Sequence, residues 1–373
     1  MEKKLLEEKR VKTESESKIV SKIPHRTGKK RTTYNQITIK TEKDERSIDS
    51  LKLELSNTRK TFSKEVEIKR RKSVQGKNLF LKKKYKCIKR YSNAHQDFIE
   101  KLIILKNGKI ASLSYDFTIK IWDIEGISKK PIFILKGHSN RVTDIIQYTN
   151  TLIASVSQDK TIRKWNINTG KDVYCYEMKH PFFCICPATD ITVCCGGSDK
   201  TLRFYDLSVD KQIEELFILE GHSDVVTCLI QVNSFTIASG SSDNSIRFWD
   251  FEKRKHLFTL EGHSSGISCL KLLKDKRFAS GSYDNSIIIW NLEKKDIEIR
   301  LKHSTGHILS ITQLNDGKIV SGNTDWSISI WNLENGNVDH TFEAHDEAVS
   351  CVAATPNGKI ISCSRDRNIK VWD

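Results

Sequence analysis

The feature that most constrains this sequence is a pattern that recurs seven times between residue 95 and residue 373. Each copy contains a His, an Asp about 21 residues later, and an aromatic residue six positions after the Asp. The His residues are His95, His138, His180, His222, His263, His303 and His345. The Asp residues are Asp116, Asp159, Asp199, Asp243, Asp284, Asp325 and Asp366. The aromatic residues are Trp122, Trp165, Tyr205, Trp249, Trp290, Trp331 and Trp372. Successive aromatic residues lie 40 to 44 positions apart, and such a period indicates stacked structural units that share one core.

A single repeat shows which elements to expect. Apolar and polar residues alternate over residues 226–230, which is the period of a β-strand. Short stretches at 236–240, 245–249 and 255–260 predict three more strands, with a Ser-Asp-Asn turn between the second and the third. Four short strands in about 40 residues are typical of a propeller blade.

Two dipeptides mark the corners of the repeats. Trp-Asp stands at 122–123, 249–250 and 372–373, and Gly-His stands at 137–138, 221–222 and 262–263. On these motifs the chain resembles the WD-repeat β-propeller family over about residues 82–373. The resemblance implies an all-β, seven-bladed propeller of four-stranded antiparallel blades, here as a domain spanning 81–373. It also implies that a strand near 85–91 completes the last blade, which would remove exposed sheet edges.

Six repeats carry a Ser four residues before the Asp, namely Ser112, Ser155, Ser239, Ser280, Ser321 and Ser362. His, Ser and Asp are the residues of a catalytic triad, but a triad occurs once per active site and needs an oxyanion hole. Six copies, each with its aromatic residue, favour a structural role. In the family that the chain resembles, His, Ser, Asp and Trp form a buried hydrogen-bond chain in each blade, and we expect the same here.

The third and sixth repeats depart from this pattern. In the third, Cys195 replaces the Ser and Tyr205 replaces the Trp, so we expect its blade to be the weakest. In the sixth, one extra residue leaves either His303 or His307 as the structural His. We favour His303, which keeps the register of the other repeats with a single insertion.

The loops beside each turn Asp and each repeat His should project onto one face of a propeller, around its central opening. The resemblance implies that this face binds partners. The positions concerned hold Phe98, Tyr115, Phe117, Arg141, Gln158, Phe183, Tyr283, Trp326 and Arg365, with His307 nearby. Aromatic and arginine side chains dominate interface energies, so we expect a protein or peptide partner at these residues, within a larger complex.

The first 90 residues differ sharply from the rest of the chain. They hold 29 Lys and Arg against 12 Asp and Glu, whereas residues 91–373 hold 33 against 35. High charge and few apolar residues predict that residues 1–80 form a disordered tail, with a short helix possible at 47–72. Basic clusters at 69–72 and 82–84 resemble a bipartite nuclear import signal. They are equally consistent with RNA or anionic surfaces, or with a solvated linker.

The remaining composition restricts the cellular context. No run of 18 apolar residues exists, so no membrane span is expected, and no apolar leader opens the chain. Ten Cys residues, several at a recurring strand position, favour a reducing compartment and hence an intracellular protein of the cytoplasm or nucleus. The cysteines of the third repeat lack the spacing of zinc ligands and are interpreted as small core fillers. We therefore expect no metal and no cofactor.

These observations favour some classes of function over others. Seven repeats without a catalytic constellation favour a non-enzymatic interaction scaffold that binds a protein or peptide on the propeller face, with the tail used for localisation or regulation. A component of an RNA-associated complex, held by the basic tail, is one alternative. A substrate adaptor for a ubiquitin ligase is another, although no Trp-Asp-x-Arg motif follows the repeats. A G-protein β-type subunit would need a sustained coiled coil, which the pattern at 47–72 interrupts.

Overall fold

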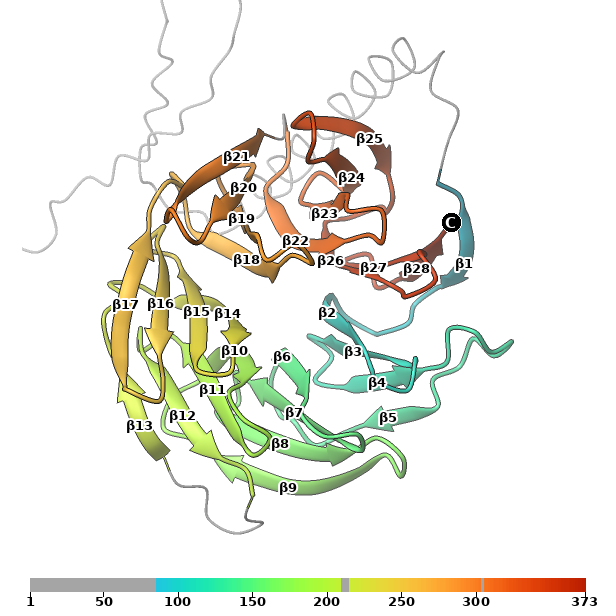
Figure 1. Ribbon diagram of the computed structural model, residues 1–373. Helices are drawn as coiled ribbons and strands as arrows, with labels where there is room; N and C mark the ends of the chain where they lie inside the picture. Colours follow the sequence, from blue (N-terminus) through green and yellow to red (C-terminus); the bar gives the residue numbers. More distant parts are fainter. Residues whose placement is uncertain (1–84, 209–214, 303–304) are drawn as a thin grey trace, which may run out of the picture. The chain divides into compact units, whose positions relative to one another are not determined.

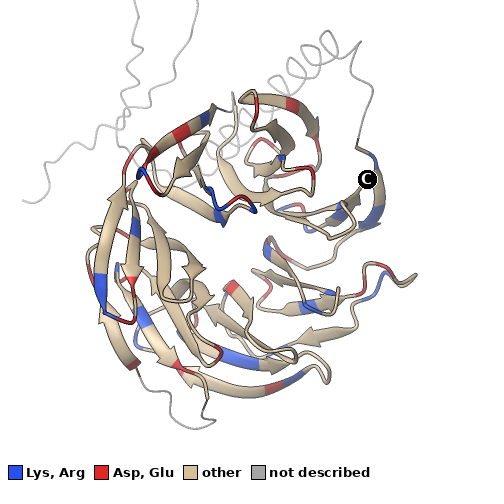
Figure 2. Ribbon diagram, viewed as in Figure 1, with Lys and Arg blue, Asp and Glu red and all other residues tan. Residues whose placement is uncertain are grey.

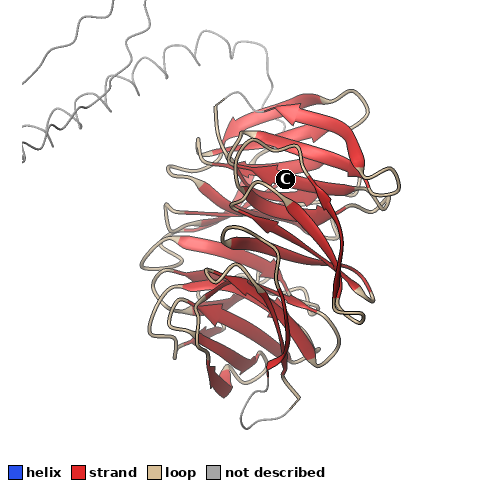
Figure 3. Cartoon of the chain, turned by 90° about the vertical axis from the view of Figure 1, so that its left-hand side faces the viewer, coloured by secondary structure: helices blue, strands red, loops and turns tan. Residues whose placement is uncertain are grey.

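A computed structural model describes residues 85–208, 215–302 and 305–373 (Figure 1). The predicted disordered tail, the possible helix at 47–72 and the candidate import signal at 69–84 lie outside these residues. Throughout the part of the chain that is described, the elements are strands joined by loops and turns (Figure 3). The all-β class expected from the repeats is therefore confirmed.

Twenty-eight strands form seven four-stranded antiparallel sheets, which are the blades. Blade 1 contains β2 (Ile99–Ile104), β3 (Ile110–Ser114), β4 (Ile119–Trp122) and β5 (Phe133–Leu135). Blade 2 contains β6 (Val142–Gln147), β7 (Leu152–Ser157), β8 (Thr161–Asn166) and β9 (Lys171–Glu177). Blade 3 contains β10 (Phe182–Pro187), β11 (Thr192–Gly197), β12 (Leu202–Asp206) and β13 (Glu215–Leu219). Blade 4 contains β14 (Val226–Asn233), β15 (Thr236–Ser241), β16 (Ile246–Asp250) and β17 (Lys255–Leu260).

The last three blades follow the same order. Blade 5 contains β18 (Ile267–Leu272), β19 (Phe278–Ser282), β20 (Ser286–Asn291) and β21 (Asp296–Lys302). Blade 6 contains β22 (Ile308–Gln313), β23 (Ile319–Asn323), β24 (Ser327–Asn332) and β25 (Asn337–Glu343). Blade 7 contains β26 (Val349–Ala354), β27 (Ile360–Ser364), β28 (Ile369–Trp372) and, from the other end of the propeller, β1 (Cys87–Tyr91).

The innermost strands of the blades close a ring. Each of β2, β6, β10, β14, β18 and β22 contacts the innermost strand of the next blade, and β26 contacts β2. The apolar core lies between neighbouring blades, because the middle strands of a blade are buried on both faces. One cluster, for example, joins Leu113 and Ile121 of blade 1 to Val142, Ile153 and Trp165 of blade 2. Each blade is therefore stabilised by packing against its neighbours as well as by its own strand pairing.

Strand β1 completes blade 7 by pairing antiparallel with β28. Two backbone hydrogen bonds between Lys86 and Asp373 extend this pairing, with N···O distances of 2.7 and 3.0 Å. Tyr91 is 2% exposed, stacks edge-on against Trp122 at 5.3 Å, and donates a hydrogen bond to the carbonyl of Asp123. The strand therefore links blade 7 to blade 1 as well as covering the edge of β28.

Candidate functional site

In five blades the repeated polar residues form one hydrogen-bond chain. In blade 5, Trp290 Nε1 donates to Ser280 Oγ at 2.8 Å, and Ser280 Oγ lies 2.8 Å from His263 Nε2. His263 Nδ1 lies 2.8 Å from Asp284 Oδ2, which also accepts the backbone N–H of Ser264. The corresponding contacts of blades 1, 2, 4 and 7 join His95 to Asp116, His138 to Asp159, His222 to Asp243 and His345 to Asp366.

Electrostatics fixes the protonation states in these chains. Burial lowers the pKa of His95, His222, His263 and His345 against the opposing effect of their Asp partners, so these imidazoles are neutral near pH 7. Burial alone would raise the pKa of Asp243, but hydrogen bonds from Ser245 and His222 outweigh it and lower the pKa to about 2. An ionised Asp requires a proton on Nδ1, which leaves Nε2 to accept from the Ser hydroxyl.

The Ser hydroxyl of each chain is therefore occupied twice, as donor to His and as acceptor from Trp. Ser239 and Ser280, for example, are 0% exposed. A nucleophile must reach substrate, and these hydroxyls lie inside the blade with both partners satisfied. The geometry supports the structural interpretation of the His, Ser, Asp and Trp series rather than a hydrolase.

Blade 3 replaces the chain by a different set of contacts. Asp199 accepts hydrogen bonds from Thr201 Oγ1 at 2.9 Å and from Arg203 Nε at 2.6 Å. Arg203 also pairs with Glu215 at 2.6 Å, and the hydroxyl of Tyr205 donates to the same carboxylate. The ion pairs lie along the outer strands, whereas Cys195 fills the buried Ser position among apolar side chains.

Blade 6 keeps the Trp-Ser contact but continues it differently. Trp331 donates to Ser321 at 2.9 Å, and Ser321 Oγ donates to Oδ1 of Asn323. His303 lies outside the described residues. The alternative residue, His307, is exposed on the loop before β22, where its Nδ1 lies 2.7 Å from Asn285 Oδ1 of blade 5. His307 is therefore not part of the buried chain.

The residue after each turn Asp adopts a left-handed backbone conformation in all seven blades, with φ between 64° and 73°. These residues are Phe117, Lys160, Lys200, Asn244, Asn285, Trp326 and Arg367. Asn tolerates this conformation, but an aromatic residue is strained by it. Phe117 is nevertheless 42% exposed, so its ring gains little core burial in return for the strain.

The predicted face residues separate into one cluster and several isolated positions. Arg141 lies over the ring of Tyr115 at 4.3 Å, Tyr115 contacts Phe98 at 6.0 Å, and Arg365 lies 6.0 Å from the Phe98 ring. We call these four residues the aromatic-arginine cluster. Neither arginine forms an ion pair with a residue that the structure describes.

The other predicted face residues do not join this cluster. Tyr283 contacts His307 edge-on at 5.7 Å and forms a second, smaller group. Neither Phe183 nor Trp326 takes part in a ring contact in the described propeller. Gln158 and Trp326 are half-buried. The backbone carbonyl of Trp326 accepts hydrogen bonds from the N–H groups of Ala344 and His345. This contact gives Trp326 a role in joining blade 6 to the start of blade 7.

Glu100 was missed by sequence reasoning. It stands five residues after its repeat His, where Thr143, Thr227, Ser268 and Ser350 each donate a hydrogen bond to a backbone carbonyl of the following blade. Glu100 breaks that series. Burial raises the pKa of its carboxyl, although Arg365 and Tyr115 oppose the shift. The sequence does show this difference, because a carboxylate stands where four other repeats have a hydroxyl.

The cysteines of blade 3 pack among apolar side chains. Cys184, Cys186 and Cys194 belong to the core between blades 3 and 4. Burial raises the pKa of the Cys184, Cys194 and Cys195 thiols well above the usual range, so they stay protonated. Within the described ranges, no group of three or more His, Cys, Asp or Glu residues could hold a metal ion.

A charged pair joins the innermost strands of blades 1 and 2. Lys101 of β2 binds Asp144 of β6 with an N···O distance of 2.5 Å. Asp144 also accepts the backbone N–H of Ile145 and of Ile185, so one carboxylate links blades 1, 2 and 3. The pair is best explained as a structural link between blades. Figure 2 shows that charges of both signs are interspersed over the rest of the propeller.

Comparison with known families agrees with this geometry. The family model for the WD domain, G-beta repeat, matches residues 85–123, 129–166, 213–250, 254–291 and 336–373, which is more than half of the chain. The chain therefore belongs to the WD-repeat family. The unmatched stretches contain most of blades 3 and 6, the two blades whose polar contacts differ. No curated protein matches the chain at a significant level.

Members of this family are generally protein-interaction scaffolds, typically without enzymatic activity, so protein partners are implied for this chain. In the three described ranges, no helix is long and apolar enough to cross a membrane.

Proposed function

We propose that this protein is a non-enzymatic scaffold that binds a protein or peptide partner through the aromatic-arginine cluster of Phe98, Tyr115, Arg141 and Arg365. The observation that carries the proposal is the pair of arginines that stack on aromatic rings without an ion-pair partner. A guanidinium ordered in this way keeps its hydrogen-bond donors available at little further entropic cost.

The location of the cluster supports the same function. Phe98 and Arg141 directly precede the innermost strands of blades 1 and 2, and Phe98 is 40% exposed. Tyr115 and Arg365 lie in the turns between the two middle strands of blades 1 and 7. The hydrogen bonds from Tyr115 N to Phe98 O and from Gln158 N to Arg141 O hold two of these loops to the turns of blades 1 and 2. A preorganised group of aromatic and arginine side chains has the composition of an interface hot spot.

The test uses the full chain as bait, with cross-linking and mass spectrometry of captured proteins. We expect the double variant Arg141→Ala and Arg365→Ala to lose a partner that the unchanged chain retains. Arg254→Ala, on an exposed outer turn of blade 4, is the matched control and should keep it. Circular dichroism melting curves of all three proteins exclude unfolding as the cause. Retention of every partner by the folded double variant would place binding on another surface.

A second candidate function uses the basic tail. The tail has 29 basic and 12 acidic residues up to residue 90, which favours an RNA-associated complex formed by counterion release. An RNA interaction of this kind should weaken steeply with salt and disappear when residues 1–77 are removed. Binding to RNA that survives either change would contradict it.

A further inference from the structure

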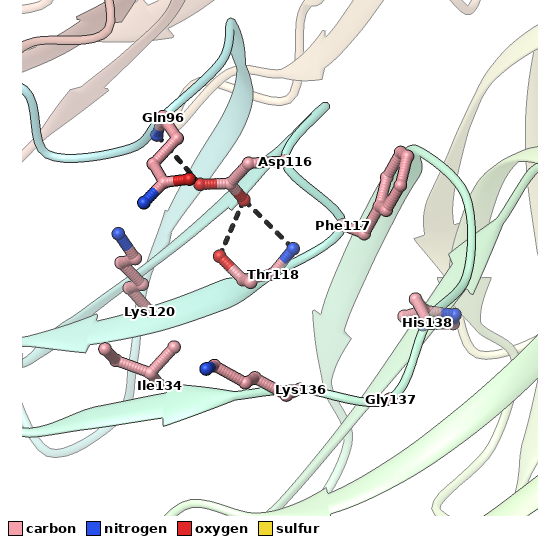
Figure 4. A pocket seen from close by; sticks show the side chains of 9 residues that line it. All are labelled: Gln96, Asp116, Phe117, Thr118, Lys120, Ile134, Lys136, Gly137 and His138. Atoms are coloured by element: carbon pink, nitrogen blue, oxygen red, sulfur yellow. Dashed lines mark hydrogen bonds between the residues drawn. The ribbon is translucent and has the colours of Figure 1, made fainter.

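A cleft on blade 1 lies beside the aromatic-arginine cluster and differs from it in chemistry. The cleft has a volume of about 400 Å³ and is lined by Gln96, Phe117, Lys120, Ile134 and Lys136, among others (Figure 4). Phe117 belongs to the same turn as Tyr115 of the cluster. A bound segment could therefore contact both surfaces.

The charge of the cleft is positive. Lys136 is exposed. Burial lowers the pKa of Lys120, and the positive charge of Lys136 lowers it further. The ionised carboxylate of Asp116 opposes this shift, but it supplies one negative charge against the two lysines. It also accepts hydrogen bonds from His95, the Gln96 N–H and Thr118, of which Figure 4 shows the last two. Lys120 donates to the carbonyl of Ala94, which is a neutral acceptor, so the cleft keeps a net positive charge.

In blades 2 and 3 the cation at the same strand position has an acidic partner. Arg163 of β8 pairs with Asp172 of β9, and Arg203 of β12 pairs with Glu215 of β13. On blade 1 the corresponding cation is Lys120, which pairs in register with Ile134 of the outer strand β5, and Lys136 follows two residues later. Neither lysine forms an ion pair with a described residue.

The walls of the cleft are apolar. Ile134 is 46% exposed and Phe117 is 42% exposed. Phe117 occupies a strained left-handed position with φ of 68°, where Gly or Asn would be favoured. All seven blades share this turn conformation, so Phe117 is distinguished by its exposed apolar ring beside the cleft, which is suited to a binding contact.

We propose that this cleft binds an anionic side chain, carrying a carboxylate or a phosphoryl group, of an extended partner segment whose neighbouring apolar side chain packs on Phe117 and Ile134. The inference rests on the proposed function of the adjacent cluster and names the chemistry of its partner. The protein's own tail does not fit as the occupant, because its excess of basic residues would be repelled by the two lysines.

The test measures fluorescence polarisation of four labelled, capped ten-residue peptides with the full chain. Each alternates Leu with one polar residue, which is Asp, phosphoserine, Gln or Lys. We expect the Asp and phosphoserine peptides to bind at least about fivefold more tightly than the Gln peptide, and less tightly at higher salt. The better of the two acidic peptides identifies the carboxylate or the phosphoryl group as the natural source.

Two variants assign that binding to the cleft. Lys136→Glu should weaken the acidic peptides by about three- to tenfold, while Lys294→Glu, on an exposed turn of blade 5, leaves them unchanged. Phe117→Gly should weaken them while raising the melting temperature, because it removes the wall and relieves the backbone strain together. Asn244→Gly, at the same turn position of blade 4, should leave peptide affinity unchanged.

Several outcomes would overturn the proposal. These are preference for the Lys peptide, equal affinity of all four peptides, no binding of any, or acidic binding that Lys136→Glu leaves intact. Tighter binding of an oligouridylate that Lys136→Glu abolishes would make the occupant a nucleic acid instead. Partner capture that depends on Arg141 and Arg365 but not on Lys136 would retain the proposed function and reject the cleft alone.

Discussion

Blade 5 and blade 3 have the same four-stranded sheet but different polar interiors. Blade 5 has the complete chain from Trp290 through Ser280 and His263 to Asp284, whereas blade 3 has Cys195 at the Ser position and ion pairs near its outer edge. Their strand registers are nevertheless alike, with a bulge at the start of the innermost strand in each. The comparison teaches that apolar packing between blades and strand pairing establish the blade, and that the buried hydrogen bonds stabilise it further.

The largest effect should come from removing a strand rather than a polar contact. A truncated chain starting at residue 92 lacks β1, which exposes the edge of β28 and the apolar site of Tyr91. We expect it to aggregate or to lose more than about 3 kcal/mol of unfolding free energy. A chain starting at residue 78 should melt like the full chain. Equal melting temperatures for the two truncations would contradict this role of β1.

A smaller loss of stability should distinguish blade 5 from blade 3. Asp284→Ala leaves the buried His263 without its partner and should cost about 1–3 kcal/mol. Asp199→Ala, in the more exposed network of blade 3, should cost less than about 1 kcal/mol. Urea unfolding followed by tryptophan fluorescence measures both values. A cost for Asp199→Ala that equals that of Asp284→Ala would show that blade 3 depends on its polar contacts as strongly as blade 5.

Lowering the pH should destabilise the blades that have a complete hydrogen-bond chain. The pKa values of His95, His222, His263 and His345 are lowered in the folded protein, so the unfolded chain binds more protons once pH falls below about 6.5. Stability should therefore fall between pH 7.5 and 5.5. The variant His263→Gln should be less stable at pH 7.5 and should show a weaker dependence on pH. An identical pH dependence in the two proteins would argue against this linkage.

The smallest change in stability is expected for substitutions at the left-handed turn residues. Phe117→Gly removes steric strain but increases the freedom of the unfolded chain, so we expect a gain of less than about 1 kcal/mol. Asn244→Gly should change stability by only a few tenths of that amount, because Asn already tolerates the conformation. Thermal melting of both variants checks the difference. A loss of stability in Phe117→Gly would mean that the ring contributes packing that its exposure conceals.

Most of the fold could be predicted from the sequence because a repeated unit reports its structure seven times. The strands predicted at 226–230, 236–240, 245–249 and 255–260 correspond to β14–β17, with ends that differ by up to three residues. Longer strands than expected arise where the pairing continues past the apolar stretch, as in β14, which contains bulges on both sides.

The candidate site was less predictable, because it depends on contacts between repeats. Arg141 contacts the ring of Tyr115 through the packing of blade 2 on blade 1, whereas Arg365 of blade 7 meets the ring of Phe98 only after the propeller closes. Asn323 accepts a hydrogen bond from Ser321, and no spacing in the sequence predicted this contact. Blade 1 lacks the acidic residue that pairs with the corresponding arginine of blades 2 and 3, and this difference becomes apparent only when the strand pairings of the blades are compared.

The contact of β1 with blade 7 also has a consequence for the order in which the molecule folds. Asn93, just after β1, binds the side chain of Asn368, although the two residues are 275 positions apart. During synthesis the first strand must therefore wait, unpaired, until the last blade has left the ribosome. Until that pairing forms, the backbone groups of residues 87–91 are open to pairing with another chain.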